Sequence, residues 1–137
     1  MSRENVELMR WLVDAFNKRD VAGFVSKCHP DLEWVPALIT RAEGGSESTY
    51  RGIEGFRRWI AETDEVMEEF QVQAEAYRDV GDDRVLLLGV VIGKGRLSGA
   101  DVQAELGQVF TLRDGQLVSY RGYLDRAEAL EAVGISE

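Results

Sequence analysis

Apolar residues recur at helical spacing along three segments of the N-terminal half, and this pattern predicts amphipathic helices. Asp20 precedes the second segment and is a good N-cap for it. Between the second and third segments, residues 32–36 alternate apolar and polar positions, which predicts a short strand with Trp34 facing inward. The three predicted helices span residues 3–18, 21–27 and 53–70.

The C-terminal half alternates apolar and polar residues as β-strands do, and a short helix follows the last strand. Two strands flank the dipeptide Asp114-Gly115, a strong signal for a β-hairpin. Residues 71–80 and 84–96 predict two earlier strands, joined by a turn at residues 81–83. Because short turns join these strands, we expect an α+β fold in which a curved antiparallel sheet wraps around the N-terminal helices.

Residues 85–92 are apolar on both faces, although an antiparallel strand with one wet face should alternate. Something must therefore cover the second face, and a partner subunit is the simplest explanation. We expect a homodimer formed through the outer face of the sheet, with Tyr123 directed toward the partner.

Residues 37–50 form a long predicted loop that contains Gly44-Gly45 and several hydroxyl side chains. Long ordered loops in compact domains often form lids or rims of binding sites. The other interpretation is a mobile surface excursion, and the sequence leaves both open. Glu43 and Glu47 are the carboxylates that a lid would bring over a site.

Composition narrows the classes of partner. A length of 137 residues predicts a single domain, residues 1–137, and a net charge of -9 makes nucleic acid and anionic membrane surfaces unfavourable partners. The single cysteine, Cys28, excludes an intrachain disulfide and fits a reducing cytoplasm. We find no apolar run long enough for a membrane span and no secretory signal.

Four short motifs, in order along the chain, resemble the SnoaL-like branch of the nuclear-transport-factor-two-like superfamily. This superfamily includes ketosteroid isomerases, polyketide cyclases and limonene epoxide hydrolases. The resemblance implies a cone-shaped α+β fold (the cystatin-like or SnoaL-like α+β barrel) with a pocket between the concave sheet face and the helices. It also implies dimers through the outer sheet face. The motifs are Ala15-Phe16-Asn17-Lys18-Arg19-Asp20, His29-Pro30-Asp31-Leu32-Glu33-Trp34, Tyr50-Arg51-Gly52-Ile53-Glu54-Gly55 and Phe110-Thr111-Leu112-Arg113-Asp114-Gly115-Gln116-Leu117-Val118.

The resemblance also implies where a ketosteroid isomerase would carry its reacting groups. The acid at the end of the first strand falls on Val35 or Pro36, and the tyrosine of the first helix falls on Leu12. The protonated acid before the last turn falls on Gln108. All three groups are replaced, so we exclude steroid isomerisation by that mechanism.

Two polar residues stand out on strands that should face the pocket. Gln108 is the single polar residue on the apolar face that runs from Val102 to Leu112, and a buried amide needs hydrogen-bond partners. Tyr120 should face inward from the last strand, unless a bulge exchanges the two faces. Each residue either serves packing or contacts a ligand.

For the other residues that could carry chemistry, a structural role is at least as well supported by the sequence as a catalytic or metal-binding role. Asp125 fits a catalytic acid by resemblance to polyketide cyclases, but Asp125 and Glu128 also have the spacing of a helix capping box. We expect His29 to serve at the surface or as a cap. Cys28 and His29 show no metal-ligand spacing, and we expect neither a metal nor another cofactor.

These features predict a small-molecule pocket for a mostly apolar, oxygen-bearing ligand such as a polyketide, terpenoid or aromatic. One hypothesis is a cofactor-free enzyme (an isomerase, a cyclase-type lyase, a hydratase or a hydrolase), for which the available base would be Asp125 or a loop acid. The other is a non-catalytic binding or accessory domain with a degenerate pocket. The predicted ligand-binding residues are Gln108, Tyr120, Trp34, Phe56, Trp59, Ile60, Phe110 and Leu12.

Overall fold

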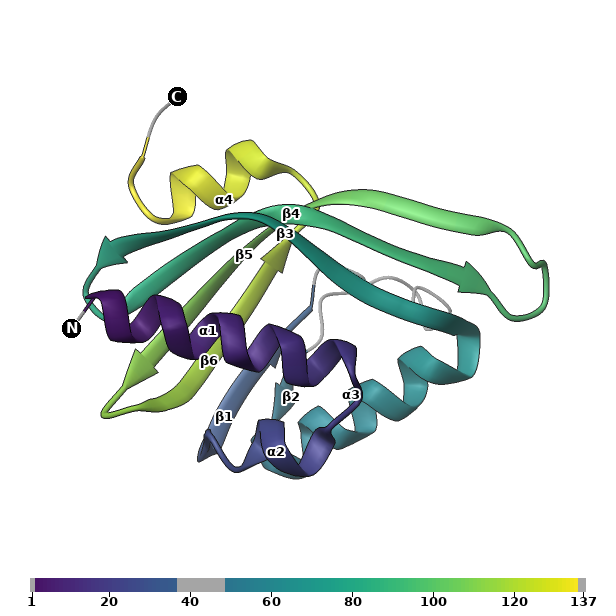
Figure 1. Cartoon of the computed structure of the whole chain (residues 1–137), viewed down its shortest axis with the longest axis horizontal. Helices are drawn as coiled ribbons and strands as arrows, with labels where there is room; N and C mark the ends of the chain where they lie inside the picture. The colour runs from purple at the N-terminus through teal and green to yellow at the C-terminus, as the bar shows by residue number, and fades with distance from the viewer. Residues whose placement is uncertain (1, 37–48, 136–137) are drawn as a thin grey trace.

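The computed structural model of the chain describes residues 2–36 and 49–135. A curved sheet has three helices against one face and a fourth helix against the other (Figure 1). The fold class predicted from the sequence is thereby confirmed. The described elements are α1 (Ser2–Asn17), α2 (Val21–Val25), β1 (Cys28–Val35), β2 (Tyr50–Arg51), α3 (Gly52–Val66), β3 (Met67–Gly81), β4 (Arg84–Gly95), β5 (Asp101–Arg113), β6 (Gln116–Tyr123) and α4 (Arg126–Ala132).

The sheet has the strand order β2-β1-β6-β5-β4-β3. Strands β3 to β6 are antiparallel neighbours joined by short turns, but β1 pairs with β6 in parallel. The prediction of a wholly antiparallel sheet is therefore wrong for this one pair. Short turns determine the direction of consecutive strands only, and β1 and β6 lie far apart in the sequence.

Helix α3 ends at Val66, four residues before the predicted end at Phe70. The chain continues directly into β3, where Met67 pairs with Gly95 across the sheet. Glu69 adopts a φ of 57° at a bulge in this strand. Phe70 remains buried, as the helical pattern predicted, but its side chain comes from a strand.

The Asp114-Gly115 turn is confirmed, and both of its residues have positive φ, at 54° and 77°. Two-residue turns of this kind match the right-handed twist of the flanking strands. Of the predicted loop 37–50, residues 37–48 lie outside the described part of the chain. Tyr50 and Arg51 pair with Trp34 and Glu33, a short strand that the sequence did not predict.

Helix α4 covers part of the second face of β4. Leu86 is fully buried there beside Ala129, Leu130 and Val133. The helix comes so close that a Cβ on Gly107 would lie 2.5 Å from the Cβ of Ala129, so that only glycine fits at this position of β5.

The first part of the two-sided apolar run in β4 is therefore explained within the chain itself. Tyr123 is partly buried against the same cluster on the outer face, and its contact with a partner subunit stays a prediction. Val90 and Ile92 remain half-buried farther along β4, and the homodimer stays a prediction.

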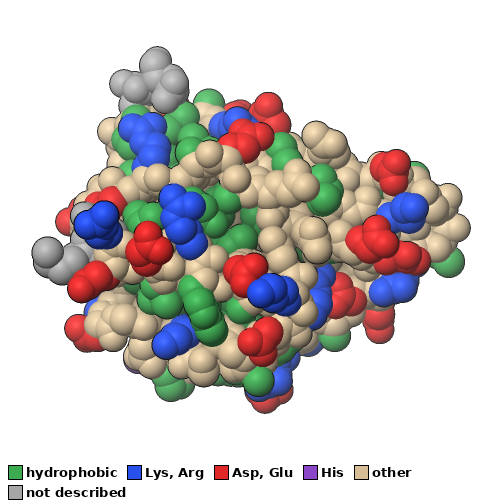
Figure 2. Space-filling view, viewed as in Figure 1, with side chains coloured by type: hydrophobic (Ala, Val, Ile, Leu, Met, Phe, Trp, Pro, Cys, Tyr) green, Lys and Arg blue, Asp and Glu red, His purple; other side chains and the backbone are tan. Residues whose placement is uncertain are grey.

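The surface carries charges of both signs. On the face shown in Figure 2, basic and acidic side chains are interspersed rather than separated by sign. Within the described residues, no helix is long and apolar enough to cross a membrane.

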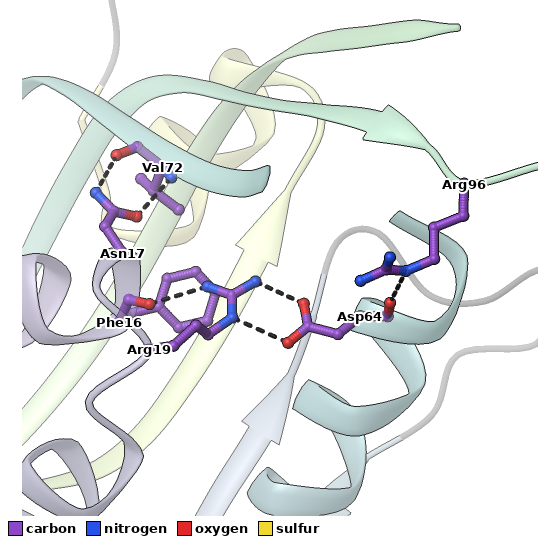
Figure 3. A network of polar contacts seen from close by, with 6 residues as sticks. All are labelled: Phe16, Asn17, Arg19, Asp64, Val72 and Arg96. Carbon is purple, nitrogen blue, oxygen red and sulfur yellow. Dashed lines mark hydrogen bonds and ion pairs between the residues drawn. The ribbon is translucent and has the colours of Figure 1, made fainter. Parts of the chain in front are cut away.

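A network of polar contacts holds the end of α1 to α3 and β3 (Figure 3). The side chain of Asn17 donates to the carbonyl oxygen of Val72 and accepts from its backbone N–H, both at 2.9 Å. The guanidinium of Arg19 makes two hydrogen bonds to the carboxylate of Asp64, at 2.8 and 3.1 Å. Arg96 also donates to the backbone carbonyl of Asp64. Helix α1 is thereby fixed at its C-terminal end.

We predict that Asn17→Ala lowers the free energy of unfolding by about 1–3 kcal/mol, since it leaves both backbone groups of the buried Val72 without their partner. Asn5→Ala, on the same helix, is the matched control, because it makes the same change in helix propensity without breaking such a pair. The measurement is urea unfolding of both variants. Equal effects of the two substitutions would contradict the prediction.

Candidate ligand-binding site

A small cavity lies between the concave face of the sheet and helices α1 to α3. Its volume is about 30 Å³, which is room for one or two water molecules. The lining is almost wholly apolar and strongly aromatic. The lining residues are Met9, Val13, Phe16, Phe24, Trp34, Pro36, Trp59, Phe70, Val72, Val91, Leu106, Gln108, Phe110 and Tyr120.

Five of the eight predicted ligand-binding residues line this cavity, namely Gln108, Tyr120, Trp34, Trp59 and Phe110. The other three are buried but lie behind the wall. Phe56 stacks on Phe24 with ring centroids 4.5 Å apart and packs edge-on against Trp34. Leu12 is fully buried and Ile60 is 8% exposed.

Residues of the first helix were missed in the prediction of the wall. Met9, Val13 and Phe16 lie on one line along α1, at i, i+4 and i+7, and all three line the cavity. Leu12 belongs to the same apolar stripe but to its other side. The helical pattern was therefore visible in the sequence, but the side of the stripe that faces the cavity depends on how α1 sits on the sheet.

The last strand reaches the cavity through a bulge. The pairing of β5 with β6 shifts between Thr111 and Leu112, so that Leu117 pairs with Leu112 and Tyr120 with Phe110. Leu117 and Tyr120 both face the core as a result. Leu117 was expected on the outer face, and the bulge is the physical reason for the difference.

Gln108 and Tyr120 form the polar pair of the cavity wall. The amide Nε2 of Gln108 donates to the hydroxyl oxygen of Tyr120 at 2.9 Å. Gln108 is 6% exposed and Tyr120 is 3% exposed. The pair satisfies part of the hydrogen-bonding capacity of a buried amide, as expected for a polar residue on an apolar face.

Two further polar atoms in the wall have no partner among the described residues. They are the indole nitrogens Nε1 of Trp34 and Trp59. Leaving a buried donor without an acceptor costs about 1–3 kcal/mol. Two residues that line the cavity thus each carry an unsatisfied donor.

The described part of the lining contains no carboxylate, imidazole or amine. Asp125 is exposed and caps α4, with its Oδ1 accepting from the backbone N–H of Ala127 at 2.9 Å. The structure thus places Asp125 outside the cavity and in the capping role. Glu33 pairs with Arg51, and Asp14 pairs with Lys18, in both cases away from the cavity. Glu43 and Glu47 lie outside the described residues.

Cys28 and His29 have structural roles. The buried thiol of Cys28 lies 3.4 Å from the carbonyl oxygen of Phe24, and burial raises its pKa to about 12. His29 accepts a hydrogen bond at Nδ1 from the backbone N–H of Asp31, which closes a local turn. Within residues 2–36 and 49–135, no group of three or more side chains could hold a metal ion.

A second, polar cleft lies next to the apolar cavity, and Figure 3 shows four of the residues that line it. Its volume is about 220 Å³. Its lining includes Asn17, Arg19, Asp64 and Arg96, the residues that fix the end of α1. Phe70 lines both the cleft and the cavity, so this one ring forms part of the wall between them.

The chain matches the model of the SnoaL-like domain over residues 9–120. It therefore belongs to the SnoaL-like family. No curated protein matches the chain.

Solved structures share the fold. A nuclear-transport-factor-two-like protein of unknown function from Burkholderia pseudomallei has a TM-score of 0.78 and 20% identity, covering 98% of this chain and 99% of that chain. TerC co-crystallised with polyporic acid has a TM-score of 0.76 and 23% identity, covering 95% and 98%. A hypothetical protein with a ketosteroid isomerase-like fold from Catenulispora acidiphila, in complex with trimethylamine, has a TM-score of 0.73 and 18% identity, covering 95% and 94%. At these identities the likeness shows the fold alone.

We predict that Cys28 resists thiol reagents at neutral pH while the chain is folded, because only the thiolate reacts and burial raises the pKa of this thiol to about 12. The folded pKa lies above the ordinary value of 9.0, so the protonated thiol stabilises the fold relative to the thiolate. This contribution is complete below about pH 9 and is lost as the pH rises toward 12.

The measurement is the rate of labelling by a disulfide reagent with and without guanidinium, together with unfolding from pH 8 to 12. Cys28→Ala should remove the part of the alkaline destabilisation that comes from this group. Rapid labelling of the folded chain would contradict the prediction.

Proposed function

We propose that this protein binds a small, mostly apolar molecule that bears an oxygen function, without performing acid–base chemistry on it. The observation that carries the proposal is the composition of the cavity wall. Gln108 and Tyr120 supply polar contacts within an aromatic surface, and no acid or base accompanies them among the described lining residues. An apolar site with a few convergent polar groups is the usual form of a small-molecule pocket.

The described wall holds no acid–base group, which argues against Asp125 as the base of the enzyme hypothesis. A general base must lie within about 3 Å of the proton that it removes, or reach it through one water. Asp125 is engaged with α4 instead. Pro36, one of the two positions where resemblance to ketosteroid isomerases would require the acid, does line the cavity and cannot titrate.

A ligand needs more room than this cavity offers. At about 30 Å³ the cavity is far smaller than the ~300 Å³ at the lower end of ligand pockets. Moving the ring of Phe70 would join it to the adjacent cleft of about 220 Å³, which brings the combined space close to that range. Phe70 follows the bulged Glu69, at a point where strand pairing is already interrupted. We therefore propose that ligand enters past Phe70.

Two structures that share this fold have been crystallised with small molecules, TerC with polyporic acid and the Catenulispora acidiphila protein with trimethylamine. These ligands differ in chemistry. They therefore support the proposal that the fold binds small molecules, and the residues of each pocket determine which class of ligand binds.

We predict that Val91→Phe abolishes binding of acetophenone, an aromatic ketone used as the probe, because the added ring fills the cavity that Val91 lines. Val90→Phe is the matched control, since successive side chains of a strand point to opposite faces and Val90 lies on the outer one. Saturation-transfer NMR on acetophenone measures the binding. Equal binding by the two variants would overturn the proposed location of the site, and no binding by the unmutated protein would overturn the proposed function.

We predict that Phe70→Leu speeds the binding and release of acetophenone, because leucine is smaller than the phenylalanine that separates the cleft from the cavity. Phe56→Leu is the control, since Phe56 is fully buried behind the wall. NMR line shapes over a titration give the association and dissociation rates. If both variants exchange as the unmutated protein does, entry does not depend on Phe70.

A further inference from the structure

Two tryptophans of the cavity wall present buried hydrogen-bond donors that no described residue satisfies. Trp34 is 4% exposed and Trp59 is 5% exposed, and the Nε1 of each lacks an acceptor. Buried indole N–H groups usually find a hydrogen-bond partner. Two exceptions in the wall of one cavity therefore require an explanation.

The two indole rings lie next to the polar pair of the cavity wall. The rings of Trp34 and Trp59 have centroids 5.2 Å apart, and the ring of Trp34 lies 4.1 Å from that of Tyr120. Tyr120 in turn accepts the hydrogen bond from Gln108. The rings of both tryptophans therefore form one contiguous group with the polar pair already described.

We propose that Trp34 and Trp59 select the ligand by donating hydrogen bonds to its acceptor oxygen, so that the site prefers uncharged molecules with a ketone- or quinone-type carbonyl over hydrocarbons of the same shape. This inference rests on the proposed function. An indole N–H only donates, so its partner must be an acceptor. A charged ligand would find no counter-charge among the described lining residues, and burying an unpaired charge is far more costly than burying a carbonyl.

The neighbouring ring faces offer a weaker partner. An N–H group directed at an aromatic face gains a second-order interaction only. A carbonyl oxygen that enters the cavity therefore replaces at most a weak contact with a full hydrogen bond. The preference for carbonyl compounds follows from this difference.

The experiment compares acetophenone with α-methylstyrene, which has the same shape with a CH₂ group in place of the carbonyl oxygen. The chain has three tryptophans, which give three indole N–H signals in a ¹⁵N–¹H spectrum. These signals are assigned with Trp11→Phe, Trp34→Phe and Trp59→Phe. Acetophenone should move the indole protons of Trp34 and Trp59 downfield. Trp11 is 45% exposed and does not line the cavity, so its signal is the internal control.

Affinities give the second readout. The unmutated protein should bind acetophenone about tenfold more tightly than α-methylstyrene, the effect of roughly one net hydrogen bond. Trp34→Phe and Trp59→Phe keep an aromatic ring but remove the donor, and each should shrink the ratio of the two affinities. Trp11→Phe should leave the ratio unchanged. Because the ratio is taken within one variant, a general loss of packing affects both ligands alike and does not imitate the result.

The outcomes separate this inference from the proposed function. If both probes bind equally and the indole signals respond alike to each, the pocket binds ligand but the donors do not select it, and the inference is overturned. If neither probe binds, the proposed function fails and the inference fails with it. If the ratio survives in Trp34→Phe and Trp59→Phe, the selection arises elsewhere, with Gln108 and Tyr120 as the remaining polar groups of the described wall.

Discussion

One connected network of aromatic rings joins the elements of this fold. Within the described residues, it links Phe16 of α1, Phe24 of α2, Trp34 of β1, Phe56 and Trp59 of α3, Phe70 of β3, Phe110 of β5 and Tyr120 of β6. A sheet that curves around helices leaves a wide concave face, and large flat side chains fill it with little conformational entropy to lose. Because these rings form the core, any cavity among them is also part of the core. The candidate site and the stability of the fold therefore depend on the same side chains.

The fold was predictable wherever local pattern and local pairing agree. The periodicity of residues 3–18 and the Asp114-Gly115 turn each determined an element that the structure contains. Prediction failed where distant pairing decides the outcome. Residues 67–70 continue a helical pattern, yet they join the sheet because β4 offers Gly95 and Lys94 as partners. The parallel pairing of β1 with β6 and the packing of α4 over Leu86 bring together segments that are far apart in the sequence. A local sequence pattern does not predict such contacts.

The residues of the site were predictable where they lie on strands, because the alternation of a strand determines the face to which each side chain points. Gln108 and Phe110 face the cavity because the alternation of β5 has only two faces, one of which is apolar. A helix has a wide apolar stripe instead, and only one side of it lines the cavity. Leu12, Phe56 and Ile60 lie on the right stripes but behind the wall. The orientation of a helix about its own axis is a property of packing, and sequence periodicity does not contain it.

The polar network at the end of α1 connects the surface to the aromatic network. The guanidinium of Arg19 lies 4.6 Å from the ring centroid of Phe16, and the same group is fixed by the carboxylate of Asp64 on α3. Phe16 stacks on Trp59 with centroids 5.9 Å apart, so one ion pair positions two rings of the cavity wall, one from each helix. The pair is partly exposed and its own contribution to stability is small. Its effect on the site is larger than its energy suggests, because the distance between α1 and α3 sets how closely Phe16 and Trp59 approach, and with it the space that a ligand meets beyond Phe70.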